Sequence, residues 1–225
     1  MTTDAAVSLA AIYPQSMSRT TQLALPLPSR GGRRRGAGRK PKGERPLVSH
    51  KARPRFETAA AVHVTLRVAL RVWNLRSRRC FRVIEMSLEE ARGRFGLRII
   101  EFSVLGNHLH LVVEADNNDA LSRGMQGLNI RIARALNSVM RTNGSVFADH
   151  YHPRLLRTPT ELVNAIAYVL GNAEHHYGSR GPDRYSSTAC NRRRLLSHPR
   201  TWLLRMGWRR ARRVPQWLTS IGPPT

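Results

Sequence analysis

Two histidines, His108 and His110, are the residues whose type and spacing most favour chemistry in this chain. They lie in an apolar stretch, residues 107–113. Side chains alternate faces along a strand, so both imidazoles would point the same way, about 6 to 7 Å apart along the backbone. Two imidazoles that project together from a rigid strand make half of a metal site. The alternative is a hydrogen-bonded structural role, because buried titratable rings cost free energy unless they are bonded or hold a metal.

A complete metal site needs a third ligand from another element. Glu114 lies on the same strand face, but about 13 Å beyond His110 at the usual strand rise, so we expect it to stay outside the site. Tyr168 and Asn172 are four residues apart in a helical pattern and therefore share one helix face. An amide oxygen is a suitable ligand for Mg²⁺ or Mn²⁺. The tyrosine hydroxyl would then lie one helical turn away. In the alternative, Tyr168 packs in a core and Asn172 faces solvent.

The charge of the chain favours a polyanionic partner. Its 225 residues carry 38 lysines and arginines against 14 acidic residues, a formal net charge of +24. Nearly all of this positive charge is arginine, whose planar fork donates two parallel hydrogen bonds to a phosphate. We therefore expect a nucleic-acid partner. A solvated basic surface, or the arginine enrichment of a GC-rich genome, is the alternative.

The remaining composition excludes several classes of protein. Cys80 and Cys190 are far apart and match no CxxC pattern, so they predict neither a disulfide framework nor a cysteine-rich zinc site. No apolar run approaches the roughly 18 residues of a membrane span. The first residues include Asp4 and no early basic residue, which does not fit a signal peptide. We expect a cytoplasmic, nucleoid-associated bacterial protein with no membrane partner.

A second His-x-His sequence, His150-Tyr151-His152, follows in the middle of the chain. Its imidazoles offer further metal ligands or contacts to DNA. Tyr151 is the second candidate nucleophile, but it has no amide partner one helical turn away. A structural zinc site built from both histidine pairs, His108, His110, His150 and His152, is a competing hypothesis, since four such ligands can close a tetrahedral site.

The elements that must position these residues can be read from periodicity and turn signals. Residues 1–55 predict a disordered basic arm, in which Gly38-Arg39-Lys40-Pro41 weakly resembles an AT-hook core and Met17 is an alternative start. Alternation and helical spacing then predict further elements. They are strands at 62–68, 97–104 and 108–114, helices at 77–94, 119–141 and 158–175, and an irregular segment at 145–157 that includes an edge strand or a docking loop.

This order of elements predicts an α+β fold. It fits a ferredoxin-like, mostly antiparallel sheet with helices packed on one side. The turn signal Gly106-Asn107 joins the second and third strands as a hairpin. We divide the chain into a disordered arm (1–55), a catalytic domain (56–180) and an arginine-rich C-terminal tail (181–225), with a short helix at about 198–211 and a loose end.

Residues 106–113, Gly-Asn-His-Leu-His-Leu-Val-Val, resemble the HUH motif (histidine, hydrophobe, histidine) of the small single-tyrosine transposases. The group that matches best is the REP-associated tyrosine transposases and their insertion-sequence relatives. The similarity extends from about Val62 to about His175, and His63-Val64-Thr65 resembles the first strand of the group. Three departures are Gly106 for a usual proline, Ala173 after Asn172 for a frequent proline, and His150 for an arginine.

This resemblance implies a mechanism and a set of roles. Tyr168 would be the nucleophile, and His108, His110 and Asn172 would hold Mg²⁺ or Mn²⁺. The substrate would be single-stranded or hairpin DNA, cleaved and rejoined through a 5′-phosphotyrosine by a monomer or homodimer. A non-catalytic, domesticated DNA-binding protein of the same fold is the alternative. As DNA contacts we name Arg123, Arg131, Arg134, Arg141, His150 and His152.

Overall fold

The computed structural model describes residues 55–178 and 181–221. The predicted basic arm up to residue 54, the weak AT-hook match and the alternative start at Met17 lie outside the described residues.

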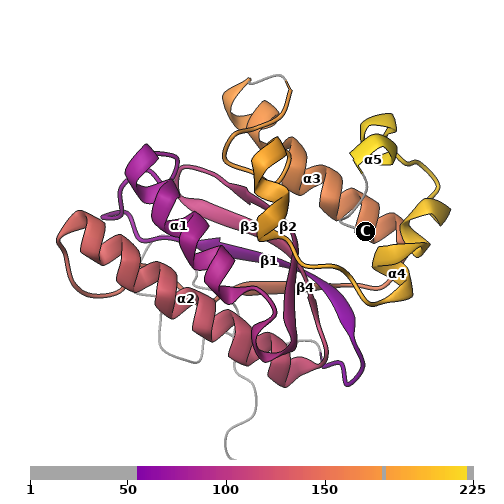
Figure 1. The fold of residues 1–225 in the computed structure, drawn as a ribbon, viewed down its shortest axis with the longest axis horizontal. Helices are drawn as coiled ribbons and strands as arrows, with labels where there is room; N and C mark the ends of the chain where they lie inside the picture. Colours follow the sequence, from indigo (N-terminus) through magenta and orange to yellow (C-terminus); the bar gives the residue numbers. More distant parts are fainter. Residues whose placement is uncertain (1–54, 179–180, 222–225) are drawn as a thin grey trace, which may run out of the picture. The chain divides into compact units, whose positions relative to one another are not determined.

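A four-stranded antiparallel sheet forms the centre of the described chain (Figure 1). The strand order is β2-β3-β1-β4, and every neighbouring pair is antiparallel. With the two helices that follow β1 and β3, this is the ferredoxin-like βαββαβ arrangement, so the predicted fold class is confirmed. The elements are β1 (Ala60–Arg67), α1 (Arg78–Ala91), η1 (Arg94–Gly96), β2 (Leu97–Val104), β3 (His108–Ala115), α2 (Asn118–Met140) and β4 (His152–Leu156).

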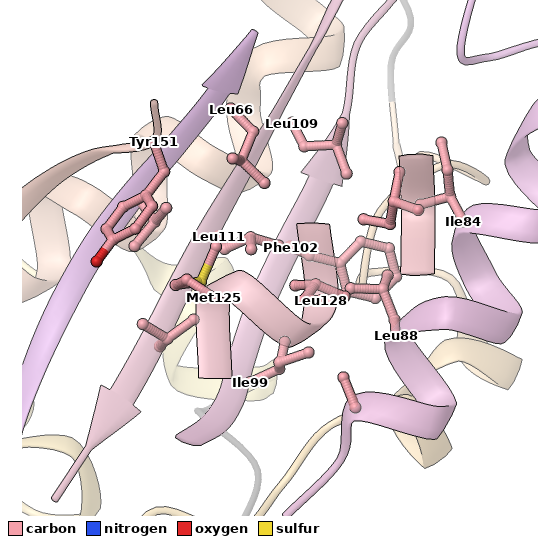
Figure 2. Close-up of a cluster of buried hydrophobic side chains, with 14 of the residues drawn as sticks. Leu66, Ile84, Leu88, Ile99, Phe102, Leu109, Leu111, Met125, Leu128 and Tyr151 are labelled. Atoms are coloured by element: carbon pink, nitrogen blue, oxygen red, sulfur yellow. The ribbon is translucent and has the colours of Figure 1, made fainter. Parts of the chain in front are cut away.

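Helices cover both faces of the sheet. The prediction that all the helices pack on one side is therefore wrong, because the third long helix lies on the other side. α1 and α2 pack on the face that holds Leu66, Leu109 and Leu111 (Figure 2). α3 (Pro159–Tyr177) packs on the opposite face, against Ile100 and Val112. The physical reason is that β2 and β3 are buried on both sides, so neither face can be left to water.

The hairpin between β2 and β3 is confirmed. The Leu105 N–H donates to the His108 carbonyl at 2.9 Å, which closes the turn at Gly106 and Asn107. A bulge between Ile99 and Glu101 shifts the register further along the pair. The turn thus fixes where the histidine strand begins, one residue after Asn107.

Well-formed caps set both ends of α3. Thr158 accepts from the Glu161 N–H, while the Glu161 carboxylate accepts from the Thr158 N–H, a complete capping box with Pro159 in the first turn. The helix ends at Gly178, whose φ of 62° is the left-handed conformation that glycine adopts without strain.

The described part of the C-terminal region packs on the domain. Its short elements are η2 (Cys190–Leu195), α4 (Trp202–Arg205), η3 (Gly207–Arg210) and α5 (Gln216–Ile221). Backbone N–H groups of Ser187 and Ser197 donate to carbonyls of β2 at 3.0 and 2.7 Å, which covers the free edge of that strand. The single helix predicted at 198–211 is two short pieces, which are separated at Met206, where φ is −132°. The Trp202 ring packs so close to Gly207 that no Cβ would fit there.

Glu114 anchors this region and stays outside the histidine pair, as expected. Its buried carboxylate accepts from Arg98 Nε at 2.5 Å and from the backbone N–H groups of Arg200 and Thr201. Burial alone would raise the pKa of Glu114, but the hydrogen bonds from Thr201, Arg98 and Arg200 outweigh it and hold the pKa below its usual value.

Candidate active site

The two histidines of β3 project from the sheet toward α3. The ring centroids of His108 and His110 are 4.8 Å apart. His110 is buried and His108 is half-buried. Across the sheet, Thr65 of β1 lies opposite His110 and Arg67 opposite His108. The strand therefore places both imidazoles on one face, as their spacing predicts.

One face of α3 meets these imidazoles. Tyr168, Asn172 and His176 follow one another at four-residue intervals, so they form a stripe along the helix. The Tyr168 ring stands edge-on to the His110 ring, 5.2 Å between centroids, and the His176 ring is 6.1 Å from that of His108. Asn172 lies between them and is buried. The structure thus brings Tyr168 to the histidine pair and leaves about half of its surface exposed.

A third histidine, His63, belongs to this cluster, although sequence reasoning did not name it among the site residues. His63 Nε2 lies 3.3 Å from His110 Nδ1, and the rings stack at 5.4 Å. Thr65 Oγ lies 3.2 Å from the same nitrogen. The alternation of His63 and Thr65 was visible in the sequence. Only the pairing of β1 with β3 shows that both side chains face His110.

The environment keeps these imidazoles neutral. Burial, then the neighbouring His108 and His63, lower the pKa of His110 to about 3. Burial, then Arg154 and His152, lower the pKa of His63 to about 4. Burial, then His176 and Arg67, also lower the pKa of His108. Neutral imidazole is the form that binds a metal ion.

The donor atoms at the site fit a divalent cation. His110 Nε2 and Asn172 Nδ2 are both buried and have no hydrogen-bond partner among the described residues. Since an amide can turn by 180°, Asn172 can present its oxygen where its nitrogen lies. Ser103 Oγ, from the strand position opposite His110, is also buried without a partner there. Two imidazoles and an amide oxygen suit Mg²⁺ or Mn²⁺.

The four-histidine zinc hypothesis is not supported. Within residues 55–178 and 181–221, no three His, Cys, Asp or Glu side chains are grouped so that they could hold a metal ion. His150 lies in an exposed loop, and its backbone N–H donates to Asp149. An amide is therefore needed to complete a set of three ligands with His108 and His110.

Tyr151 is poorly placed to be a nucleophile. Its side chain is buried in the cluster with Leu66 and Leu111, on the sheet face opposite His110 (Figure 2). The exposed ring of Tyr168 is on the histidine face.

The predicted DNA contacts fall on two sides of the sheet. Arg123, Arg131 and Arg134 are on α2, which packs on the face opposite the histidines, and Arg131 lies 3.6 Å from Glu90. Arg141 ends that helix with a φ of 55°. His152, by contrast, lies opposite Thr65 on β4 and shares the histidine face. Arg154, which sequence reasoning missed, lies opposite His63 on the same face. Arg154 could be identified as a candidate only from the pairing of β4 with β1.

The lowered pKa values predict how stability depends on pH. In the metal-free protein, the folded pKa of His63 is about 4, below the usual 6.5 of an unfolded chain. Between pH 6.5 and 4 the unfolded state therefore binds more protons, so the free energy of unfolding falls as the pH falls. We expect urea denaturation in EDTA at pH 7, 6 and 5 to show this loss, and His63→Gln to reduce it. An equal pH dependence in both proteins would contradict the assignment.

A family model and two solved structures are similar to parts of this chain. The family model "Transposase IS200 like" matches residues 57–162, a span that ends before Tyr168 and Asn172. A solved REP-associated tyrosine transposase bound to a REP hairpin is similar in fold, with a TM-score of 0.50 and 14% identity. The match covers 62% of this chain and 82% of that one. A protein of Deinococcus radiodurans R1 described as a transposase aligns with a TM-score of 0.37 and 14% identity, over 51% of this chain and 88% of its own. No curated protein matches.

In the described residues, none of the helices combines the length and the hydropathy that a membrane span requires.

Proposed function

The chain matches the IS200-like transposase family over residues 57–162, and from that match we propose that it cleaves and rejoins single-stranded DNA through Tyr168. The observation that carries this proposal is the half-exposed Tyr168 ring, which stands against His110 and His63 beside buried nitrogens of His110 and Asn172 that have no partner in the described chain. Hairpin DNA is the proposed target, by analogy with the REP hairpin bound to the similar transposase.

The proposed reaction is a transesterification. The Tyr168 oxygen attacks the scissile phosphorus, the bond from phosphorus to the 3′ oxygen breaks, and a 5′-phosphotyrosine and a free 3′-hydroxyl result. The phenolic proton is lost and the released 3′ oxygen gains one, so the step is balanced. A second 3′-hydroxyl can then displace Tyr168 and reseal the strand.

Each of the other residues has a role in positioning. His108, His110 and Asn172 would hold Mg²⁺ or Mn²⁺, which would polarise the scissile phosphate. Arg154 and His152 lie on the same sheet face, where their side chains can contact the DNA backbone. Because Tyr168 reaches histidines of its own chain, a monomer contains the whole proposed site.

His63 and Thr65 orient His110 in this proposal. Both lie within 3.3 Å of His110 Nδ1, so Nε2 is the nitrogen left for the metal. Such outer partners of ligating histidines typically contribute 10- to 100-fold to metal affinity or activity. We expect His63→Ala to lower Mn²⁺ affinity roughly 10-fold or more, measured by calorimetry. His198→Ala, which removes an exposed histidine, is the control. Equal affinities in the two variants would contradict the role of His63.

The function is tested by incubating the full chain with labelled hairpin DNA that has single-stranded flanks, with Mg²⁺ or with EDTA. A covalent protein–DNA complex that survives denaturing electrophoresis, and forms only with the metal, is expected. The non-catalytic alternative predicts salt-dependent hairpin binding with no covalent complex.

We also propose that the catalytic domain extends from residue 56 to residue 180. The described residues beyond 180 hydrogen-bond along β2 and pack against α3. We therefore propose that they support the catalytic domain rather than act as a separate tail.

A further inference from the structure

A pocket of about 430 Å³ opens beside His108, at the end of the sheet where β3 begins. Its lining includes Asn74, Asn107, His176 and Tyr177. The volume is in the range of small-molecule sites. Except for His108, none of these residues has a part in the proposed cleavage chemistry.

Tyr177 is the most unusual of these residues, because it is rigidly held and yet 48% exposed. Its hydroxyl accepts the Gly106 N–H at 2.8 Å. The Arg76 guanidinium lies 4.4 Å above its ring and 4.3 Å from the ring of Tyr185. Asp183 binds Arg76 with two hydrogen bonds of 2.8 Å, so this guanidinium is already paired. The ring is therefore fixed in place by contacts that leave much of it open.

Polar groups beside Tyr177 are arranged to donate hydrogen bonds. Asn74 Oδ1 accepts from the backbone N–H of Arg76 at 2.9 Å, and Asn107 Oδ1 lies 2.6 Å from His108 Nδ1. With both amide oxygens engaged, the amide NH₂ groups are the ends left to meet a ligand. Proteins usually bind an unpaired nucleobase by stacking it on an aromatic side chain and hydrogen-bonding its edge. The Tyr177 ring and the two amide NH₂ groups offer both kinds of contact.

We propose that this pocket binds an unpaired base of the single-stranded DNA next to the scissile phosphate, stacked on Tyr177. The proposal rests on the proposed function, and it names the part of the substrate that the site recognises. Since His108 lines the pocket, a base bound there lies next to the proposed metal ligands and hence close to the reacting phosphate.

The test is a binding comparison made in the full chain with Tyr168→Phe, so that DNA is not cleaved. One hairpin has single-stranded thymidine flanks, and the other has abasic flanks with the same phosphates. With Tyr177 present, we expect the abasic flanks to weaken binding about 5- to 150-fold, the usual effect of one stacked base. Tyr177→Leu should remove most of this difference, while Tyr177→Phe should keep it. Phe95→Leu is the matched control, because Phe95 is 53% exposed and lies before β2, at the other end of the sheet.

The outcomes separate this proposal from the cleavage function. If Tyr177→Leu shows the same loss on abasic flanks as the parent, the pocket proposal is overturned, whatever the result of the cleavage assay. If chains with Tyr168 form no covalent complex but Tyr177→Leu still removes the difference, the cleavage function fails and the base pocket stands. Thermal melting of each variant shows whether it is folded.

Discussion

Replacing Tyr168 by phenylalanine is expected to abolish the covalent DNA complex, a loss of at least about 1,000-fold in its rate of formation. The substitution removes one oxygen and keeps the ring that packs against His110 and His63. Hairpin binding and the melting temperature should stay near those of the parent chain. The measurement is denaturing electrophoresis of labelled hairpin DNA in the presence of Mg²⁺ or Mn²⁺.

Tyr151→Phe is the matched control for this prediction. Tyr151 is buried on the opposite face of the sheet, so its variant should form the complex at nearly the parent rate. A complex that persists in Tyr168→Phe and disappears in Tyr151→Phe would refute the assignment of the nucleophile.

Glu114→Gln is expected to give the largest loss of stability. Glu114 is fully buried and accepts from Arg98 and two backbone N–H groups, so glutamine leaves a buried guanidinium without its nearest charge. Breaking a buried ion pair costs about 3 to 5 kcal/mol. We expect about 3 kcal/mol here, because Asp116 still pairs with Arg98. In a chain of this size the melting temperature should fall by roughly 6 to 12 °C.

The control for this substitution is Glu89→Gln. Glu89 pairs with Arg194 at an exposed position, where an ion pair contributes little, so the stability should change by about 0.5 kcal/mol or less. The pKa of Glu114 is lowered by folding, so its charged form contributes stability that is lost as the pH falls below that pKa. The difference between the parent and Glu114→Gln should therefore shrink in acid. A difference that grows in acid would contradict this account.

Local patterns were sufficient to predict most of the elements. The strand at 97–104, the turn at Gly106 and the start of the helix at residue 158 were each predicted from a few neighbouring residues, because each depends on nearby backbone geometry. Gly93 was missed as the signal that ends α1. The chain leaves the helix at Arg92, where ψ is 124°, and turns at Gly93 with a φ of 70°, before the predicted end.

Long-range pairing explains what the sequence did not show. His63 and Arg154 join the histidine face only because β1 lies between β3 and β4, and this order cannot be read from alternation within one strand. The packing of α3 on the other face of the sheet was not predicted, for a related reason. An apolar run such as residues 109–113 indicates burial, but it does not say how many layers bury it.

The α2 arginines show a limit of composition arguments. Their charge predicts contact with phosphate, yet α2 packs on the face that lies across the sheet from Tyr168. A DNA strand that reaches Tyr168 would instead pass Arg154 and His152 on the face of β4 that the histidines share.

The central claim, that two imidazoles and one amide hold a divalent cation beside Tyr168, is tested most directly by Mn²⁺ titration of the metal-free full chain by calorimetry. We predict one Mn²⁺ per chain, with affinity reduced at least about 10-fold in both His110→Ala and Asn172→Ala and unchanged in His150→Ala. Equal Mn²⁺ binding by the parent, His110→Ala and Asn172→Ala would contradict it.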